Sequence, residues 1–255
     1  MKTPTNRRKF LALSLALTGA GALVLTGCGG TGKSDSGNGG TPTPQPTVTP
    51  TPVPTPTPTP SPGNSAYAVT LLSPAGFSSS DAAGVSGTTQ AGEGILSNGD
   101  THALLWSGTA ASVVDLNPTG FTSSYASGIS GNTQVGYGSN SNSTYALLWS
   151  GSAASVVDLN PTGFSSSKAL GVSGNIQVGY GGYGSISPVP DHALLWTGTA
   201  ASVVDLHRAT SGLTLNGVMI KPISSQATAV DSNGNIAGFV TDANNVTYAV
   251  LWTKK

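Results

Sequence analysis

The chain has 255 residues and no net charge, and only 8% of its residues are charged, against about 25% in an average soluble protein. Proteins that bind nucleic acid carry clustered lysine and arginine, so this composition argues against a nucleic-acid partner. The only cysteine is Cys28, which excludes a disulfide framework and a cysteine-rich metal site.

The first 27 residues have the three zones of a signal peptide. Met1–Lys9 carries four basic residues and no acid, and Phe10–Thr26 is apolar with small residues. A membrane-spanning helix needs about 20 mainly apolar residues, and this shorter run is interrupted by serine, threonine and glycine. The hexapeptide NRRKFL, which contains Arg7 and Arg8, resembles the twin-arginine export motif, although Asn6 stands where serine or threonine is usual. We therefore expect residues 1–27 to be a removable export signal.

Residues 25–28 read Leu-Thr-Gly-Cys and resemble the lipobox of bacterial lipoproteins. In that family the cysteine takes diacylglycerol and becomes the new N-terminus after cleavage. Two or three acyl chains anchor a protein stably where one is marginal, at about 0.8 kcal/mol per buried CH₂. The resemblance implies lipidation of Cys28 and an extracytoplasmic protein of the bacterial cell envelope, at the outer membrane or the cell surface. Without residues 1–27, six Lys and Arg remain against ten Asp and Glu.

Residues 28–63 predict a tether. Its first part is rich in glycine and serine, which favours a flexible coil, and residues 41–62 alternate threonine and proline. Proline lacks a backbone donor and restricts the residue before it to extended conformations, so neither helix nor sheet can form. As a polyproline II helix, these 22 residues would reach roughly 68 Å, and would hold the following domain away from the membrane.

Residues 64–255 contain one unit that occurs four times. Each unit ends its third apolar run with a tryptophan, and these residues lie 43, 47 and 56 positions apart: Trp106, Trp149, Trp196 and Trp252. Every unit has three or four runs of strand length, rich in Val, Ile, Leu and aromatic residues and separated by Gly, Asn and Ser. No window has sustained helical periodicity. The sequence therefore predicts an all-β repeat domain.

The apolar runs, such as His-Ala-Leu-Leu-Trp, predict strands that are covered on both faces, because a half-exposed strand would alternate apolar and polar residues. Sheets stacked around an axis provide that environment, as in a propeller. The last unit lacks its Val-Val-Asp-Leu segment, and a matching segment, Val69–Leu72, precedes the first unit. Donation of this strand to the final sheet would close a ring and remove exposed edges. We expect a four-bladed β-propeller over Ala66–Trp252, with a β-solenoid or a sandwich as alternatives.

The same residues resemble a family of bacterial extracellular repeats named for its His-Ala-Phe tripeptide. The match consists of a glycine in the first strand of three units, the Leu-Trp pairs and the Asp-Leu pairs. The chain departs from the family pattern where leucine replaces phenylalanine and where Tyr145 and Tyr248 replace histidine. The resemblance covers the repeat domain and implies an exported β-rich protein. It implies no activity, because the family carries no settled one.

Residues that recur in each unit are expected to have structural roles. The tryptophans would pack in the core rather than bind sugars. His102 and His192 have tyrosine at their places in the other units, which favours a repeated hydrogen bond over catalysis. Asp231–Asn235 predicts a hairpin turn, because a calcium loop needs glycine at its sixth position and Ile236 stands there. Three aspartates are interpreted as strand-end caps that accept backbone N–H groups: Asp115, Asp158 and Asp205.

Positions that vary between units are the candidates for binding. Four different side chains follow the serine run, and such variation at one structural place indicates an exposed site. Two irregular segments of the third and fourth units, Tyr183–Asp191 and His207–Ile223, are the other candidates, because loops on a rigid scaffold usually carry function. Neutral surface drift is the alternative. The expected ligand rim comprises Asp81, Tyr125, Lys168, Gln226, Tyr183 and His207.

These features predict a non-enzymatic, monomeric protein that is attached to the membrane through a lipid on Cys28 and binds an envelope glycan or protein through this rim. We expect no catalytic residue, no cofactor and no metal site, because no polar group stands apart from the repeat pattern. The alternatives are a propeller-type hydrolase that uses His192 or His207, and a structural spacer or adhesin.

Overall fold

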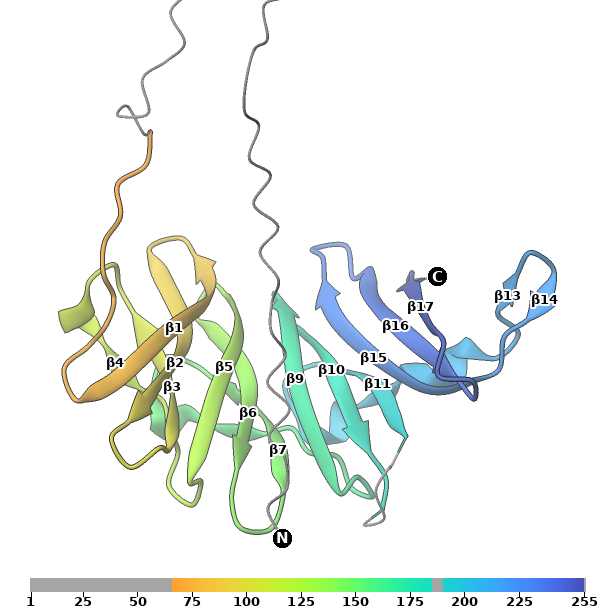
Figure 1. Ribbon diagram of the computed structural model, residues 1–255, viewed down its shortest axis with the longest axis horizontal. Helices are drawn as coiled ribbons and strands as arrows, with labels where there is room; N and C mark the ends of the chain where they lie inside the picture. Colours follow the sequence, from red (N-terminus) through yellow and green to blue (C-terminus); the bar gives the residue numbers. More distant parts are fainter. Residues whose placement is uncertain (1–65, 185–189, 255) are drawn as a thin grey trace, which may run out of the picture. The chain divides into compact units, whose positions relative to one another are not determined.

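The computed structural model describes residues 66–184 and 190–254, which form small antiparallel sheets that follow one another along the chain (Figure 1). The only helical segments in these residues are four short 3-10 turns, so the predicted all-β class is confirmed. None of these segments is long and apolar enough to span a membrane. The expected export signal, lipidation site and tether lie outside the described residues.

Three sheets have four strands each, and a fourth has three. In every one the strands pair in the order of the sequence. The first sheet contains β1 (Phe77–Ser86), β2 (Thr89–Leu96), β3 (Thr101–Trp106) and β4 (Val114–Asp115). The second contains β5 (Ser123–Ser130), β6 (Thr133–Ser139), β7 (Thr144–Trp149) and β8 (Val157–Asp158). The third contains β9 (Ser166–Ser173), β10 (Ile176–Gly182), β11 (Asp191–Trp196) and β12 (Val204–Asp205).

The fourth sheet is reached through an insertion. The short turn η4 (Leu206–Thr210) is followed by a two-stranded hairpin of β13 (Thr214–Leu215) and β14 (Val218–Met219). The fourth sheet then contains β15 (Pro222–Val230), β16 (Ile236–Asp242) and β17 (Thr247–Trp252). Three further 3-10 turns precede the short fourth strands of the other sheets: η1 (Ala110–Ser112), η2 (Ala153–Ser155) and η3 (Ala200–Ser202).

The turn between β15 and β16 is closed by one aspartate. Asp231 Oδ1 accepts the backbone N–H groups of Asn233 and Asn235 at 2.9 and 2.8 Å. The Asn235 side chain also donates to this carboxylate, and these hydrogen bonds hold the pKa of Asp231 below its usual value. The predicted hairpin turn at Asp231–Asn235 is therefore confirmed.

The recurring glycine of the second strand is required by a bulge in the first. In the second sheet, the register between β5 and β6 shifts between Ala126 and Gly128, and the carbonyl oxygen of Tyr125 then approaches Gly136 so closely that a Cβ would overlap it. The same approach to the bulged strand occurs in the other sheets, at Gly92, Gly179 and Gly238. Glycine in the second strand thus allows it to pair closely with the bulged first strand.

Neighbouring sheets pack face to face through three apolar clusters. In each cluster, side chains of one sheet that point toward the next sheet contact side chains of that next sheet that point back. Between the second and third sheets, for example, the cluster contains Val135, Ala146, Leu148, Leu159, Phe164, Ala169, Leu194 and Trp196. Trp106, Trp149 and Trp196 are 1%, 0% and 0% exposed, which confirms their predicted core position. Trp252, in the last sheet, is half-buried.

A buried serine joins each of these pairs of sheets. The Oγ of Ser124 accepts the backbone N–H of Ala103, from the third strand of the preceding sheet, at 3.0 Å. Ser167 accepts from Ala146 and Ser225 accepts from Ala193, at 3.0 and 2.9 Å. These serines recur in the sequence, and they accept backbone N–H groups that would otherwise be buried without a partner.

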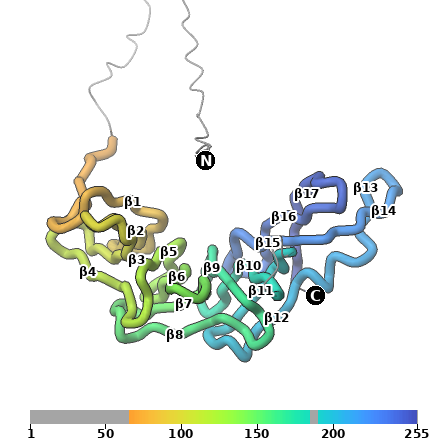
Figure 2. The backbone as a smooth tube through the Cα atoms, turned by 60° about the horizontal axis from the view of Figure 1, so that its bottom comes forward, coloured from red at the N-terminus to blue at the C-terminus, as the bar shows by residue number. Residues whose placement is uncertain are grey.

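The predicted closure of a ring by Val69–Leu72 is wrong. Among the described residues, the fourth sheet ends at β17, and no strand precedes β1. Val69 and Leu71 are 93% and 80% exposed. Contacts run from each sheet to the next, and Figure 2 shows the first and fourth sheets at opposite ends of this succession.

The ring does not close because a fourth strand of this kind contributes little to stability. The fourth strand of the first sheet is only two residues long and pairs with two residues of β3. It is held in addition by Asp115, which contacts His102, and Leu71 stands where this aspartate would be in the proposed donated strand. Two pairs without this histidine–aspartate contact contribute little against the entropy of closing a loop over the whole domain.

Gly136→Ala tests the bulge. The added methyl group would overlap the backbone of β5, and we expect the free energy of unfolding to fall by about 3 kcal/mol, measured by chemical denaturation. Gly128→Ala is the matched control, because its nearest neighbour would lie at 3.4 Å, an ordinary contact. Equal effects of the two substitutions would contradict the steric explanation.

Candidate functional site

Two predicted structural roles are confirmed at the outer strands. His102 Nδ1 lies 2.7 Å from Asp115 Oδ2, and His192 Nδ1 lies 3.0 Å from Asp205 Oδ2. The second oxygen of each aspartate caps the strand end by accepting a backbone N–H two residues later, from Asn117 in the first sheet at 2.8 Å. The equivalent caps are Asp158 with Asn160 and Asp205 with His207.

Four predicted rim residues occupy equivalent places on the first strands. Each lies directly across from a residue of the second strand, in the pairs Asp81–Glu93, Tyr125–Tyr137, Lys168–Tyr180 and Gln226–Phe239. We call these eight residues the inner row. Two of the predicted members meet, because the Tyr125 ring stacks on Tyr137 at 4.6 Å and Lys168 Nζ lies 4.2 Å from the centroid of the same ring.

The inner row is largely occupied by its own contacts. Burial, followed by the neighbouring Tyr125, Glu93 and Tyr180, raises the pKa of Tyr137 to about 12. Burial and the nearby Asp81 raise the pKa of Glu93. At the far end, Gln226 Nε2 donates to Asp191 Oδ2 at 2.7 Å. Lys168 contacts Tyr137 of the second sheet and Gln226 binds Asp191 of the third, so these two members are held across neighbouring sheets.

The two other predicted rim residues come together at a different place. Tyr183, from the first irregular segment, lies 3.9 Å from the Phe164 ring and 5.0 Å from the His192 ring, measured between centroids. His207, from the second segment, stacks on His192 with centroids 4.3 Å apart. The two insertions of the sequence thus converge on one histidine.

This arrangement departs from the first two sheets. There the phenylalanine contacts the ring of the third strand edge-on: Phe77 lies 6.4 Å from His102, and Phe121 lies 6.0 Å from Tyr145. In the third sheet, Tyr183 contacts both the phenylalanine and the histidine. The third sheet therefore has the same scaffold here as the first two sheets and differs from them by the addition of Tyr183 and His207.

His207 takes the place that asparagine has in the other units. In the second unit Ser167 Oγ donates to Asn160 Oδ1 at 2.6 Å, and here Ser225 Oγ lies 2.9 Å from His207 Nδ1. Because Ser225 Oγ already accepts the Ala193 N–H, its proton is available to this nitrogen. Burial, together with the neighbouring His192, lowers the pKa of His207. The lowered pKa favours the neutral ring, and in the tautomer with an unprotonated Nδ1 this nitrogen accepts from Ser225 Oγ.

Asp205 contacts three other side chains of the site. Its Oδ2 contacts His192 Nδ1 and also Arg208 Nε at 3.4 Å. The Tyr183 hydroxyl is a third partner, and burial followed by the charge of Asp205 raises the pKa of this tyrosine. The Asp205 side chain is 11% exposed, whereas that of Arg208 is 82% exposed, so the guanidinium reaches into solvent from a buried carboxylate.

A surface hollow of about 420 Å³ lies beside these groups. We call it the Tyr183 hollow; it is lined by Thr162, Phe164, Tyr183, Val203, Val204, Asp205 and Arg208. Small-molecule sites commonly have volumes of about 300–1,000 Å³ and combine apolar walls with a few polar groups. Sequence reasoning named Tyr183 and His207 but missed Phe164 and Asp205, because both also fit the repeat pattern.

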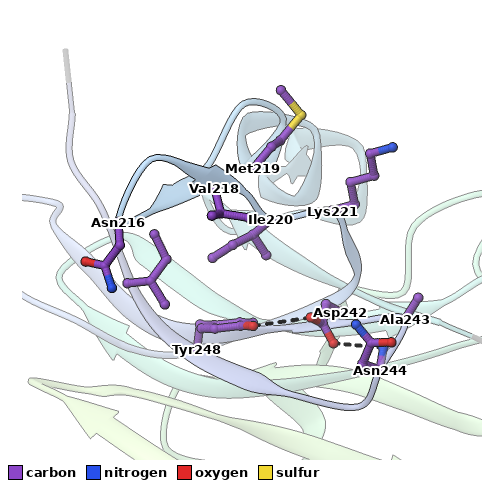
Figure 3. Close-up of a pocket in the computed structure, with 10 residues that line it drawn as sticks. Asn216, Val218, Met219, Ile220, Lys221, Asp242, Ala243, Asn244 and Tyr248 are labelled. Atoms are coloured by element: carbon purple, nitrogen blue, oxygen red, sulfur yellow. Dashed lines mark hydrogen bonds between the residues drawn. The ribbon is translucent and has the colours of Figure 1, made fainter.

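A larger hollow, of about 530 Å³, lies between the β13–β14 hairpin and the fourth sheet. Figure 3 shows the Tyr248 hydroxyl and Asn244 directed at Asp242 within it. Asp242 already accepts the backbone N–H groups of Asn244 and Val246 and the Tyr248 hydroxyl. The carboxylate of this hollow is thus already held by the turn around it.

The contacts of Ser225 do not distinguish it as a nucleophile. Its side chain is 0% exposed, and it makes the same backbone hydrogen bond as Ser124 and Ser167. Within the described ranges, no group of three or more His, Cys, Asp or Glu side chains is placed to hold a metal ion.

Comparison with protein families, with curated proteins and with solved structures gave no match for this chain. The resemblance to the His-Ala-Phe repeats thus remains a prediction. The description of the site depends on the residues themselves, chiefly on Tyr183, His192, Asp205, His207 and Arg208.

His207→Asn tests the neutral state of this histidine. The folded pKa lies below the ordinary value of 6.5, so the unfolded chain binds more protons near and below this pH, and stability is lost as the pH falls through 6.5. Asparagine restores the side chain of the other units and does not titrate. We expect the variant to match the wild type above this pH and to lose less stability below it, measured by thermal unfolding. Identical acid dependence would contradict a lowered pKa.

Proposed function

We propose that the chain is an exported, lipid-anchored β-repeat protein of the bacterial cell envelope that binds an envelope glycan without catalysis. The basic and apolar leader, the Leu-Thr-Gly-Cys sequence at Cys28 and the Thr/Pro tether support the anchored placement. The observation that carries the binding role is the convergence of two non-repeated segments, through Tyr183 and Arg208, on one hollow.

The chemistry of the Tyr183 hollow favours a sugar. A pyranose ring presents C–H groups on its faces and hydroxyl groups at its edge. Tyr183 offers a ring that is 39% exposed and rests on Phe164. The Asp205 carboxylate accepts hydrogen bonds and the Arg208 guanidinium donates them. An apolar ring beside a fixed polar pair fits such a ligand better than it fits a flat protein surface.

We further propose that the four sheets are blades of the propeller type that remain in an open array. Their sequential strand order and their face-to-face packing support this assignment. The first strands also contact one another from sheet to sheet, as the inner strands of blades do. Membership in the His-Ala-Phe repeat family is part of the same proposal.

Glycan binding is tested with the full chain in detergent on an array of bacterial envelope polysaccharides. We expect at least one to bind, and Tyr183→Ala and Arg208→Ala each to weaken its binding by about tenfold, as truncation of an anchor residue does. Lys254→Ala, which removes an exposed cation away from the hollow, is the control and should bind as the wild type does.

Two results would redirect this proposal. Loss of binding in Lys168→Ala, with binding retained in Arg208→Ala, would move the site to the inner row. No binding to any glycan, together with capture of one envelope protein in a pull-down, would assign the hollow to a protein partner. No ligand in either experiment would leave a spacer or adhesin role.

Lipidation is tested by growth with labelled palmitate. We expect the wild-type chain to carry the label and to fractionate with membranes. Cys28→Ser removes the acylated thiol, so it should lose both properties. A Cys28→Ser chain that still carries the label would show that the acyl groups are attached elsewhere.

A further inference from the structure

We propose that copies of this chain associate head to tail, with the open face of the fourth sheet in one copy packed on the open face of the first sheet in another. The proposal depends only on contacts between sheets and is independent of the ligand. It departs from the monomer expected from the sequence. Both faces belong to described residues, and each has counterparts that are buried inside the chain.

The fourth sheet exposes a face that the other sheets bury. Leu251 of β17 is 64% exposed, whereas its counterparts Leu105 and Leu148 are 8% exposed. Ala249 is also exposed, although the alanines at its place in the other sheets are fully buried: Ala103, Ala146 and Ala193, each 0% exposed. The side chains match in type, and among the described residues β17 has neither a fourth strand beside it nor a sheet packed beyond it.

The first sheet exposes the complementary face. Val85 of β1 is 68% exposed, whereas Ile129, at the same place in β5, packs against the cluster of the preceding sheet. Ala82 is exposed, and its counterparts Ala126, Ala169 and Ala227 are 2%, 0% and 0% exposed. The first sheet thus exposes small apolar side chains at the positions through which β5, β9 and β15 contact the preceding sheet.

The polar groups of the two faces match as well. Ser80 occupies the place of Ser124, whose Oγ accepts the Ala103 N–H of the preceding sheet. The Ser80 hydroxyl donates to Ser73 Oγ at 3.2 Å, so its oxygen can still accept a hydrogen bond. Ala249 pairs with Phe239 as Ala103 pairs with Glu93, which directs its N–H to the open edge of β17. A hydrogen bond from Ala249 N–H to Ser80 Oγ of a second copy would repeat the one found between sheets.

A second copy is the occupant that these observations favour. The faces lie at opposite ends of the succession of sheets, with the second and third sheets between them (Figure 1). The alanine and leucine side chains on the two faces match those that pack between neighbouring sheets three times within the chain. A head-to-tail contact between different faces forms a ring if the rotation closes and a filament if it does not; both are association of copies.

The experiment places one arginine on each face of the full chain. Leu251→Arg alters the fourth sheet and Val85→Arg alters the first, and both positions are exposed, so each variant should fold; Ala82→Arg is the substitute if Val85→Arg does not. Sedimentation velocity in density-matched detergent measures association over a wide range of protein concentration. We expect the wild type to form dimers or larger species, and each variant to associate at least about thirtyfold more weakly, as loss of an interface hot spot does.

Mixing the two variants gives the decisive measurement. Leu251→Arg keeps the first-sheet face and Val85→Arg keeps the fourth-sheet face, so the mixture should form a dimer that neither variant forms alone. Val218→Arg is the control, because this residue is 70% exposed on the β13–β14 hairpin, and it should associate as the wild type does. A wild-type chain that stays monomeric at every concentration would overturn the proposal. So would self-association of either variant at wild-type strength, or a mixture that remains monomeric.

Discussion

Face-to-face packing of neighbouring sheets is the constraint on which the rest of this structure depends. Each third strand is apolar toward both sides, as in the run from Ala103 to Trp106, and one small sheet cannot cover two apolar faces by itself. Burial contributes about 25 cal/mol per Å² of apolar surface, so a sheet gains most when it has a neighbour on each side. The stability of this domain therefore accumulates from sheet to sheet, as in other repeat proteins.

The polar residues that recur in each unit follow from the same packing. A strand buried on both faces still has backbone N–H groups that need partners. Ser124 and its equivalents supply oxygen atoms to the preceding sheet, and the aspartates at the strand ends hold the next turn. Because these repeated contacts already hold the scaffold, the third unit can depart from the pattern. His207 keeps the hydrogen bond to a serine that Asn160 makes, and it adds a ring that stacks on His192.

The sequence predicted the local structure well, because local structure follows from local sterics and periodicity. The apolar runs predicted the strands, Asp231–Asn235 predicted a turn, and recurrence identified Trp149 and His192 as structural. It predicted the candidate site in part. Tyr183 and His207 were named because they interrupt the repeat, whereas Asp205 and Phe164 were not, because they obey it. The approach of the two insertions is set by how the segments after β10 and after β12 fold back on His192 of β11, which the repeat pattern does not encode.

What the sequence determined by itself is therefore the unit: its strands, its glycine at the bulge and the side chains that face its neighbours. Only the tertiary structure decided how the units end and where the insertions meet. The match between Val69–Leu72 and a fourth strand concerns residue types only. A fourth strand pairs through two residues, which is too weak to bring the first and last sheets together. The meeting of Tyr183, His192 and His207 likewise depends on how neighbouring segments of the third unit fold back on β11, and such contacts are fixed by packing rather than by the order of residues.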